Sequence, residues 1–151
     1  MHLVAVVETE IAIKDRQNHT IGGTENPGVK PKILIVDDQK EVCVAMKRYF
    51  TVCGFDVECA SELEEAEAMI TCNSYAVLIS DLHLTPIRGN EGLELIRVLR
   101  HRSPQTRTVM LTAYSTPDVE KEAYACGVAK VLNKPVALSE LRRILQEFLE
   151  R

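Results

Sequence analysis

The stretch Ile33-Leu34-Ile35-Val36-Asp37-Asp38 runs from four branched aliphatic residues straight into two carboxylates. A short apolar run bounded by polar residues is typical of a strand buried on both faces of a parallel sheet. Asp37 and Asp38 then stand at the carboxyl end of that strand, and open parallel sheets bind their ligands beyond these ends. The stretch therefore predicts a central strand and one side of a binding site.

Three later strand-like stretches also end in polar residues. They lead to Asp81 after 76–80, Thr112 after 109–111 and Lys134 after 131–133. Because the carboxyl ends of parallel strands meet at one edge, we expect three carboxylates, one hydroxyl and one ammonium group to converge there. Mg²⁺ prefers oxygen ligands of this kind, and a positive charge beside them suits a phosphoryl group. The pattern predicts a site for phosphoryl chemistry that uses Mg²⁺.

From Lys32 onward, strand-like and helix-like segments alternate. The predicted strands are 33–37, 55–60, 75–80, 107–112 and 128–133. The predicted helices are 39–53, a segment from Ser61 onward, 91–101, 117–126 and a segment from Ser139 onward. Such alternation predicts an α/β fold, with a doubly wound, five-stranded parallel sheet and helices on both faces.

Local signals place the ends of several helices. Gly54 and Gly127 are expected to follow the first and fourth helices. Ser61-x-x-Glu64 is expected to open the second helix as a capping box. Thr116 and Ser139 are expected to cap the fourth and fifth helices at their N-termini.

The fourth helix is the weakest of the five by its apolar content. Its anchors toward the core are expected to be Val119, Ala123, Tyr124 and Cys126. Small anchors bury little surface, and burial stabilises by only about 25 cal/mol per Å². We therefore expect this helix to move most easily, which makes it a natural place for a switch.

The composition narrows the class of protein. With 151 residues and 46% hydrophobic residues, the chain has enough material for one globular domain with a proper core. Its net charge of -4 does not favour a nucleic-acid partner, and no apolar run reaches the roughly 20 residues of a membrane span. The five cysteines are odd in number and include no Cys-x-x-Cys, so we expect reduced thiols in the cytoplasm.

Residues 1–31 differ from the rest, because their later part is rich in glycine, asparagine and proline. We expect a flexible leader or arm at 1–31 and one folded domain at 32–151. The alternative is an arm that pairs with a sheet edge or with a second subunit.

The ordered motifs resemble the receiver domain of two-component response regulators, of the chemotaxis-regulator type. The matching residues are Ile33 to Asp38, then Asp81, then Met110-Leu111-Thr112-Ala113-Tyr114, then Lys134-Pro135. Each motif alone is weak, but together and in this order they are specific, and the match covers about residues 32–150. The resemblance implies a flavodoxin-like sheet with strand order 2-1-3-4-5.

The resemblance also implies roles around the acidic residues. Asp81 matches the phosphoacceptor, Asp38 a direct ligand of Mg²⁺, and Asp37 its acidic neighbour that often acts through water. His83 matches the position whose backbone carbonyl binds the metal.

Thr112 matches the switch hydroxyl of the family, and Lys134 matches the phosphate-binding lysine, whose bond to Pro135 is commonly cis. Two features depart from the family pattern. The loop 82–91 is longer than usual, and Val131 stands where many receivers have Tyr or Phe. We expect the signal to travel through the loop after Thr112 and the fourth helix, or through a different output surface.

The partners implied by the resemblance are proteins. A histidine kinase or histidine phosphotransfer protein would supply the phosphate, and a downstream protein or an effector domain of a longer chain would respond. We expect no contact with nucleic acid or membrane through this chain, while a homodimer stays an open alternative. The family implies a bacterial signalling module that loses its phosphate slowly, rather than an enzyme.

Two other classes remain as alternatives. A phosphohydrolase of the haloacid dehalogenase type also uses an aspartate nucleophile and Mg²⁺, but its first strand ends in Asp-x-Asp, whereas this one ends in Asp37-Asp38-Gln39. A receiver fold that serves only for docking or dimerisation is less favoured, because the acceptor and metal-binding residues are all present.

Overall fold

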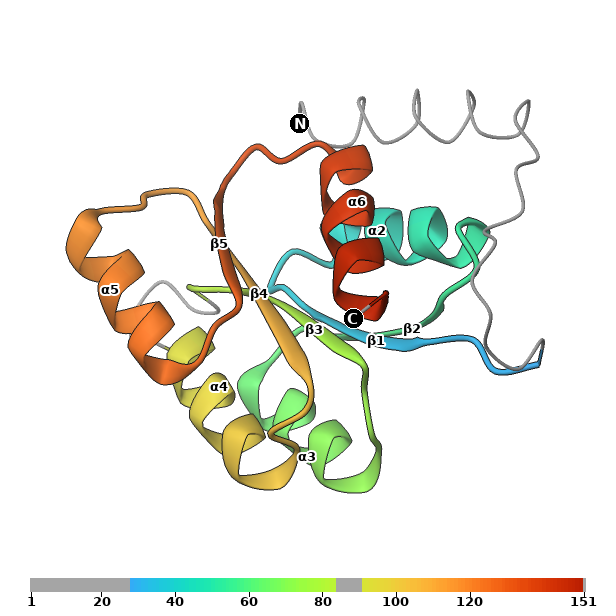
Figure 1. Cartoon of the computed structure of the whole chain (residues 1–151), viewed down its shortest axis with the longest axis horizontal. Helices are drawn as coiled ribbons and strands as arrows, with labels where there is room; N and C mark the ends of the chain where they lie inside the picture. The colour runs from blue at the N-terminus through green and yellow to red at the C-terminus, as the bar shows by residue number, and fades with distance from the viewer. Residues whose placement is uncertain (1–27, 84–90, 151) are drawn as a thin grey trace.

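The structure of the protein, a computed structural model, describes residues 28–83 and 91–150. Within them, five parallel strands form one sheet between two layers of helices (Figure 1). The strands are β1 (Lys32–Val36), β2 (Asp56–Ala60), β3 (Val77–Asp81), β4 (Arg107–Thr112) and β5 (Lys130–Asn133). Their order across the sheet is β2-β1-β3-β4-β5, which confirms the expected order.

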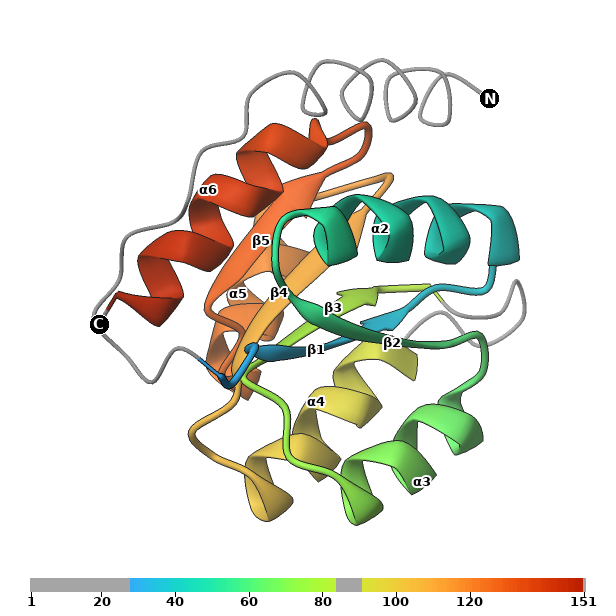
Figure 2. The same cartoon turned by 90° about the vertical axis from the view of Figure 1, so that its right-hand side faces the viewer.

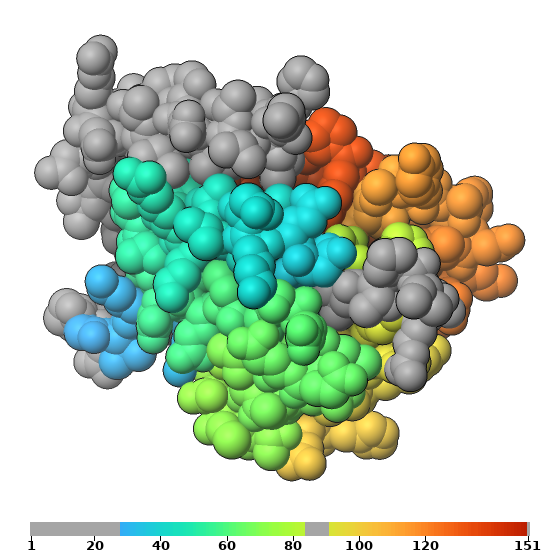
Figure 3. Space-filling view, turned by 180° about the vertical axis from the view of Figure 1, so that it is seen from behind, coloured from blue at the N-terminus to red at the C-terminus, as the bar shows by residue number. Residues whose placement is uncertain are grey.

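The helices confirm the expected alternation. They are α2 (Lys40–Val52), α3 (Leu63–Cys72), α4 (Glu91–Arg102), α5 (Pro117–Cys126) and α6 (Leu138–Leu149). Helices α2 and α6 cover one face of the sheet, while α3, α4 and α5 cover the other (Figure 2). Seen from behind, α2 and α3 form much of the visible surface (Figure 3). No helix in the described ranges is long and apolar enough to cross a membrane.

Strand β1 contributes side chains to both layers. Ile33 and Ile35 belong to the core under α2 and α6, whereas Leu34 and Val36 belong to the core under α3, α4 and α5. All four are at most 1% exposed. Because successive side chains of a strand point to opposite faces, the continuous apolar run is what a strand between two helical layers requires.

Two predicted helix caps are wrong. Helix α3 begins at Leu63 after an extended Glu62, and the N–H of Ser61 donates to the carboxylate of Glu65 at 3.0 Å, so Glu64 does not complete a capping box. Helix α6 begins at Leu138 after Ala137, which leaves Ser139 inside the helix. The side chain of Leu138 is 1% exposed, so the chain turns helical early enough to bury it.

Other predicted helix ends are confirmed. The Thr116 side chain accepts a hydrogen bond from the N–H of Val119 at 3.2 Å, with Pro117 as the first helical residue. Gly54 follows α2 with φ +97°, and Gly127 follows α5 with φ +100°. These φ values lie in the left-handed region, which glycine enters without the steric penalty of a Cβ.

Helix α5 is anchored lightly, as expected, but one of its anchors was assigned wrongly. Ala123 is its one buried residue, and Val119 and Cys126 pack partly against the core. Tyr124 is 46% exposed, and its hydroxyl accepts a hydrogen bond from the N–H of Val131 at 3.2 Å. Tyr124 therefore ties α5 to the edge strand β5 instead of filling the core.

Replacing Gly54 tests the left-handed turn after α2. Gly54→Ala should lower the free energy of unfolding by about 1–2 kcal/mol, the usual penalty of a Cβ in left-handed backbone. A Cβ there meets no atom within 4 Å, so the cost is purely conformational. Gly28→Ala is the control, because Gly28 has equally open space and no positive φ. Urea unfolding measures both, and equal losses would contradict the assignment.

Candidate functional site

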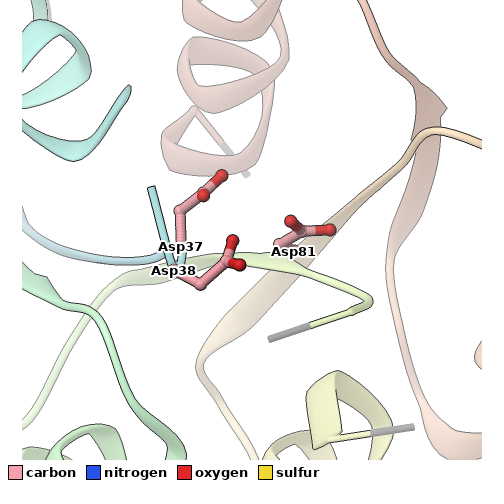
Figure 4. Close-up of side chains that lie close together, drawn as sticks. All are labelled: Asp37, Asp38 and Asp81. Atoms are coloured by element: carbon pink, nitrogen blue, oxygen red, sulfur yellow. The ribbon is translucent and has the colours of Figure 1, made fainter. Parts of the chain in front are cut away.

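Three aspartates gather at the carboxyl edge of the sheet. Asp37 and Asp38 follow β1 directly, and Asp81 ends β3. These strands are neighbours in register, with Val36 paired to Ser80. One carboxylate oxygen from each aspartate lies within 4.8 Å of the others, as Figure 4 illustrates. The prediction that these three side chains converge is confirmed.

Asp37 is held rigidly. Its side chain is 3% exposed; Oδ1 accepts from the N–H of Gln39 at 2.9 Å, and Oδ2 accepts from Nζ of Lys134 at 3.2 Å. Its own N–H donates to the carbonyl of Ala60 at 3.1 Å. Donors on both oxygens therefore fix the orientation of the Asp37 carboxylate.

Lys134 follows β5 and bridges two of the aspartates. Its Nζ lies 3.2 Å from Oδ2 of Asp37 and 3.1 Å from Oδ2 of Asp81. Burial lowers the pKa of Lys134, but the charges and hydrogen bonds of the two aspartates outweigh burial and raise it. The lysine is therefore a permanent cation at the edge of the sheet. The bond from Lys134 to Pro135 is cis, as the resemblance implied.

Asp81 is nearly buried and has donors on both oxygens. Asp81 is 9% exposed. Lys134 donates to its Oδ2, and the N–H of His83 donates to its Oδ1 at 3.3 Å. His83 itself is exposed. The expected long loop 82–91 falls mostly on 84–90, outside the described residues.

Asp38 lies on the open side of the cluster. Burial raises its pKa most, followed by the charge of Asp37, a hydrogen bond with Asp37 and the charge of Asp81. Among the residues that the structure describes, three carboxylates face the single ammonium group of Lys134, so this part of the cluster has an excess of negative charge. Oxygen ligands with unbalanced negative charge suit a hard divalent cation, so the residues present fit Mg²⁺.

Thr112 ends β4 and is fully buried. Its Oγ1 accepts from the N–H of Tyr114 at 3.2 Å, and its carbonyl accepts from the N–H of Lys134 at 2.8 Å. Leu111, one residue earlier, is the register partner of Asp81. Thr112 thus sits at the same edge as the aspartates, on the strand between Asp81 and Lys134.

Val131 is 9% exposed and packs in the core under α3, α4 and α5.

Gly92 is a contributor that the sequence interpretation missed. A Cβ at Gly92 would lie 2.5 Å from the carbonyl oxygen of Asp81 and 2.9 Å from Cα of Leu82. The N–H of Gly92 donates to the carbonyl of Leu82 at 3.2 Å. Helix α4 can therefore begin against the end of β3 only with glycine at this position. A glycine in the first turn of a predicted helix was the available signal, because glycine disfavours helix and often marks a close backbone approach.

The fold and site together define a receiver-type α/β domain with an acidic edge. Residues 33–146 match the family of the response regulator receiver domain. The chain belongs to this family, whose members are signalling modules of two-component systems.

Known proteins with similar sequence or structure agree with this assignment. The response regulator protein PilR of Pseudomonas aeruginosa is 28% identical over 77% of the chain, which spans only 25% of PilR. The Vibrio cholerae chemotaxis protein CheY4 has a TM-score of 0.72 at 29% identity, covering 80% of this chain and 99% of that one. A response regulator from Burkholderia pseudomallei has a TM-score of 0.71 at 26% identity, and the match covers 78% of this chain and 67% of that one. That protein was solved with a phosphorylated aspartic acid, calcium ion and citrate.

Neutralising Asp38 should stabilise the protein in metal-free buffer. Since the native pKa of Asp38 is raised above its usual 3.8, ionisation at higher pH costs native stability. Asp38→Asn should raise the free energy of unfolding by about 0.5 kcal/mol at neutral pH, a modest gain because water screens the exposed carboxylate. The gain should vanish below pH 3.8, where the carboxyl is protonated in both states.

Denaturant unfolding across this pH range measures the effect. Asp56→Asn, at an exposed aspartate where β2 begins, is the control and should change the free energy of unfolding little. A loss of stability in Asp38→Asn at neutral pH would contradict the repulsion described above.

Gly92→Ala should destabilise the protein by about 1–3 kcal/mol, as for other overpacked positions. Helix propensity alone predicts the opposite, a gain of about 1 kcal/mol when alanine replaces glycine within a helix. Glu94→Ala, at an exposed site of the same helix, is the control and should change little. Thermal unfolding gives the sign, and a stabilised Gly92→Ala would show that α4 does not press on Asp81.

Proposed function

We propose that this chain accepts a phosphoryl group on Asp81 and changes its binding to a protein partner in response. The observation that carries the proposal is the position of Asp81. Its carboxylate lies 3.1 Å from the Lys134 ammonium and next to the carboxylates of Asp37 and Asp38. Membership of the receiver family supports the proposal, as does the solved relative with a phosphorylated aspartic acid.

In the proposed reaction, a carboxylate oxygen of Asp81 attacks phosphorus and the bond from phosphorus to the donor breaks. Mg²⁺ would be held by Asp37, Asp38, Asp81 and the backbone carbonyl of His83, and when bound it offsets the negative charge of the phosphoryl oxygens. The residues supply position and charge, which is most of what phosphoryl transfer requires.

Lys134 has a defined part in this reaction. Its ammonium already pairs with Asp81, and it can donate to a phosphoryl oxygen attached there with only a small shift. Its second bond, to Asp37, keeps the ammonium at the edge of the sheet while Asp81 changes. The raised pKa of Lys134 keeps that charge in place throughout the neutral range.

Thr112 would connect a phosphoryl group on Asp81 to helix α5. Its hydroxyl would donate to a phosphoryl oxygen, and it already accepts from the N–H of Tyr114 at 3.2 Å. The next residue, Ser115, bonds through its hydroxyl to Glu120 of α5 at 2.5 Å and through its N–H to Asn133 at 3.1 Å. A shift of the Thr112 hydroxyl would therefore reach α5, the most lightly anchored helix.

The proposal extends to the setting of the domain. Residues 32–151 form the receiver and 1–31 a leader, in the cytoplasm of a bacterial cell. A histidine kinase or histidine phosphotransfer protein supplies the phosphoryl group. A downstream protein or an effector domain of a longer chain responds, with no nucleic acid or membrane bound through this chain, and a homodimer stays an open alternative. Slow loss of the phosphate from Asp81 returns the domain to its resting state.

The direct test is labelling by radioactive acetyl phosphate with Mg²⁺. The parent protein should incorporate label, and Asp81→Asn should lose at least nine tenths of it, because the amide cannot form the acyl phosphate. Asp56→Asn is the control: it makes the same carboxylate-to-amide change far from the cluster and should label normally. Undiminished label in Asp81→Asn would remove the assignment, and sustained turnover of p-nitrophenyl phosphate would indicate a hydrolase instead.

A further inference from the structure

Two cysteines lie together beneath the acidic cluster. Cys43 is in the first turns of α2, and Cys59 is in the edge strand β2. The Sγ of Cys59 donates to the backbone carbonyl of Cys43 at 3.4 Å, and the interaction of the two thiols raises the pKa of Cys43 and lowers the pKa of Cys59. The two residues are thus in contact between α2 and β2, although they lie sixteen positions apart in the sequence.

The two thiols differ in their access to solvent. Cys43 is 5% exposed and belongs to the core under α2 and α6, whereas Cys59 is half-buried and packs against that core. A small reagent can therefore reach the Cys59 thiol first, because the Cys43 thiol is buried. Oxidation to a disulfide takes two steps: an accessible thiol first becomes a sulfenic acid, and a nearby protected thiol then condenses with it. Cys59 and Cys43 suit these two roles.

The surroundings of Cys59 also favour its reaction. The hydrogen bond from Cys43 lowers the pKa of Cys59 and outweighs the opposing effect of burial, and the positive charge of Lys47 acts in the same direction. The thiolate is the form of cysteine that attacks a peroxide.

We propose that Cys43 and Cys59 form an intramolecular disulfide when the protein meets hydrogen peroxide. The Cys59 thiolate attacks one peroxide oxygen, the O–O bond breaks, and sulfenic acid and hydroxide result. The Cys43 sulfur then attacks the Cys59 sulfur, the S–O bond breaks, and the thiol proton leaves with the hydroxyl as water. The two sulfurs lose two electrons in all, which reduce the peroxide.

The link would join two elements that border the proposed phosphorylation site. The Sγ of Cys43 now donates to the backbone carbonyl of Asp37 at 3.4 Å and lies 3.8 Å from that of Ala60. A disulfide sulfur has no hydrogen, so oxidation removes this donor from the residue that Lys134 also holds. The disulfide also ties the start of α2 to the edge of the sheet.

Peptide mapping of the full chain tests the proposal. Cleavage after Lys, Arg and Glu places Cys43 in peptide 42–47 and Cys59 in peptide 59–62, apart from every other cysteine. After peroxide treatment and alkylation, we expect these two peptides to be linked in more than half of the chains. Dithiothreitol should reverse the link, and the protein should remain a monomer on a non-reducing gel if it was one before.

Single substitutions provide the controls. Cys59→Ser should abolish the link, and Cys43→Ser should leave Cys59 oxidised but unlinked. Cys126→Ser should keep the link in full, because Cys126 lies in α5 on the other face of the sheet. The proposal is overturned if Cys43 and Cys59 both remain alkylatable after peroxide. It is overturned equally if Cys59 proceeds to sulfinic acid in the parent, or if either cysteine links to Cys53, Cys72 or Cys126.

Discussion

The pairing of the Lys134 ammonium with both Asp37 and Asp81 is the interaction on which the rest of the site depends. It joins the ends of β1, β3 and β5, strands that are distant in sequence, through bonds of 3.2 and 3.1 Å. Burial raises the pKa of Asp38, and the charges of Asp37 and Asp81 raise it further. Within the described residues, the one ammonium of Lys134 does not balance the three carboxylates. The same imbalance fits the metal and the phosphoryl group of the function that we propose.

The sheet brings these charges together through the alternation of a single strand. Odd-numbered apolar residues of β1 enter one core and even-numbered ones the other, which fixes the strand between two layers of helices. With β1 fixed, its register with β3 leaves Asp37 and Asp81 at the same level of the edge. Packing of aliphatic side chains thus sets the geometry of a polar site.

Apolar runs followed by polar residues are local signals, and they predicted the parallel sheet and the convergence of Asp37, Asp38, Asp81 and Lys134. The order of the strands came from the resemblance to the receiver family. Prediction from the sequence failed where the outcome depends on distant packing. The caps expected at Ser61 and Ser139 are not formed, because α3 begins at Leu63 and α6 at Leu138. The Tyr124 side chain lies at the edge strand β5 and not in the core. The contacts of Gly92 with Asp81, and of Cys43 with Cys59, join segments that no spacing rule connects.

The hydrogen bond from Val131 to the hydroxyl of Tyr124 has a consequence for how other proteins can approach. An exposed edge strand offers free backbone groups to which a second chain can add as a further strand. At β5 the outward N–H of Val131 is already taken by a tyrosine carried on α5. A partner that paired with this backbone would first have to displace the ring and so move the helix. Strand addition at Val131 is therefore coupled to the position of α5.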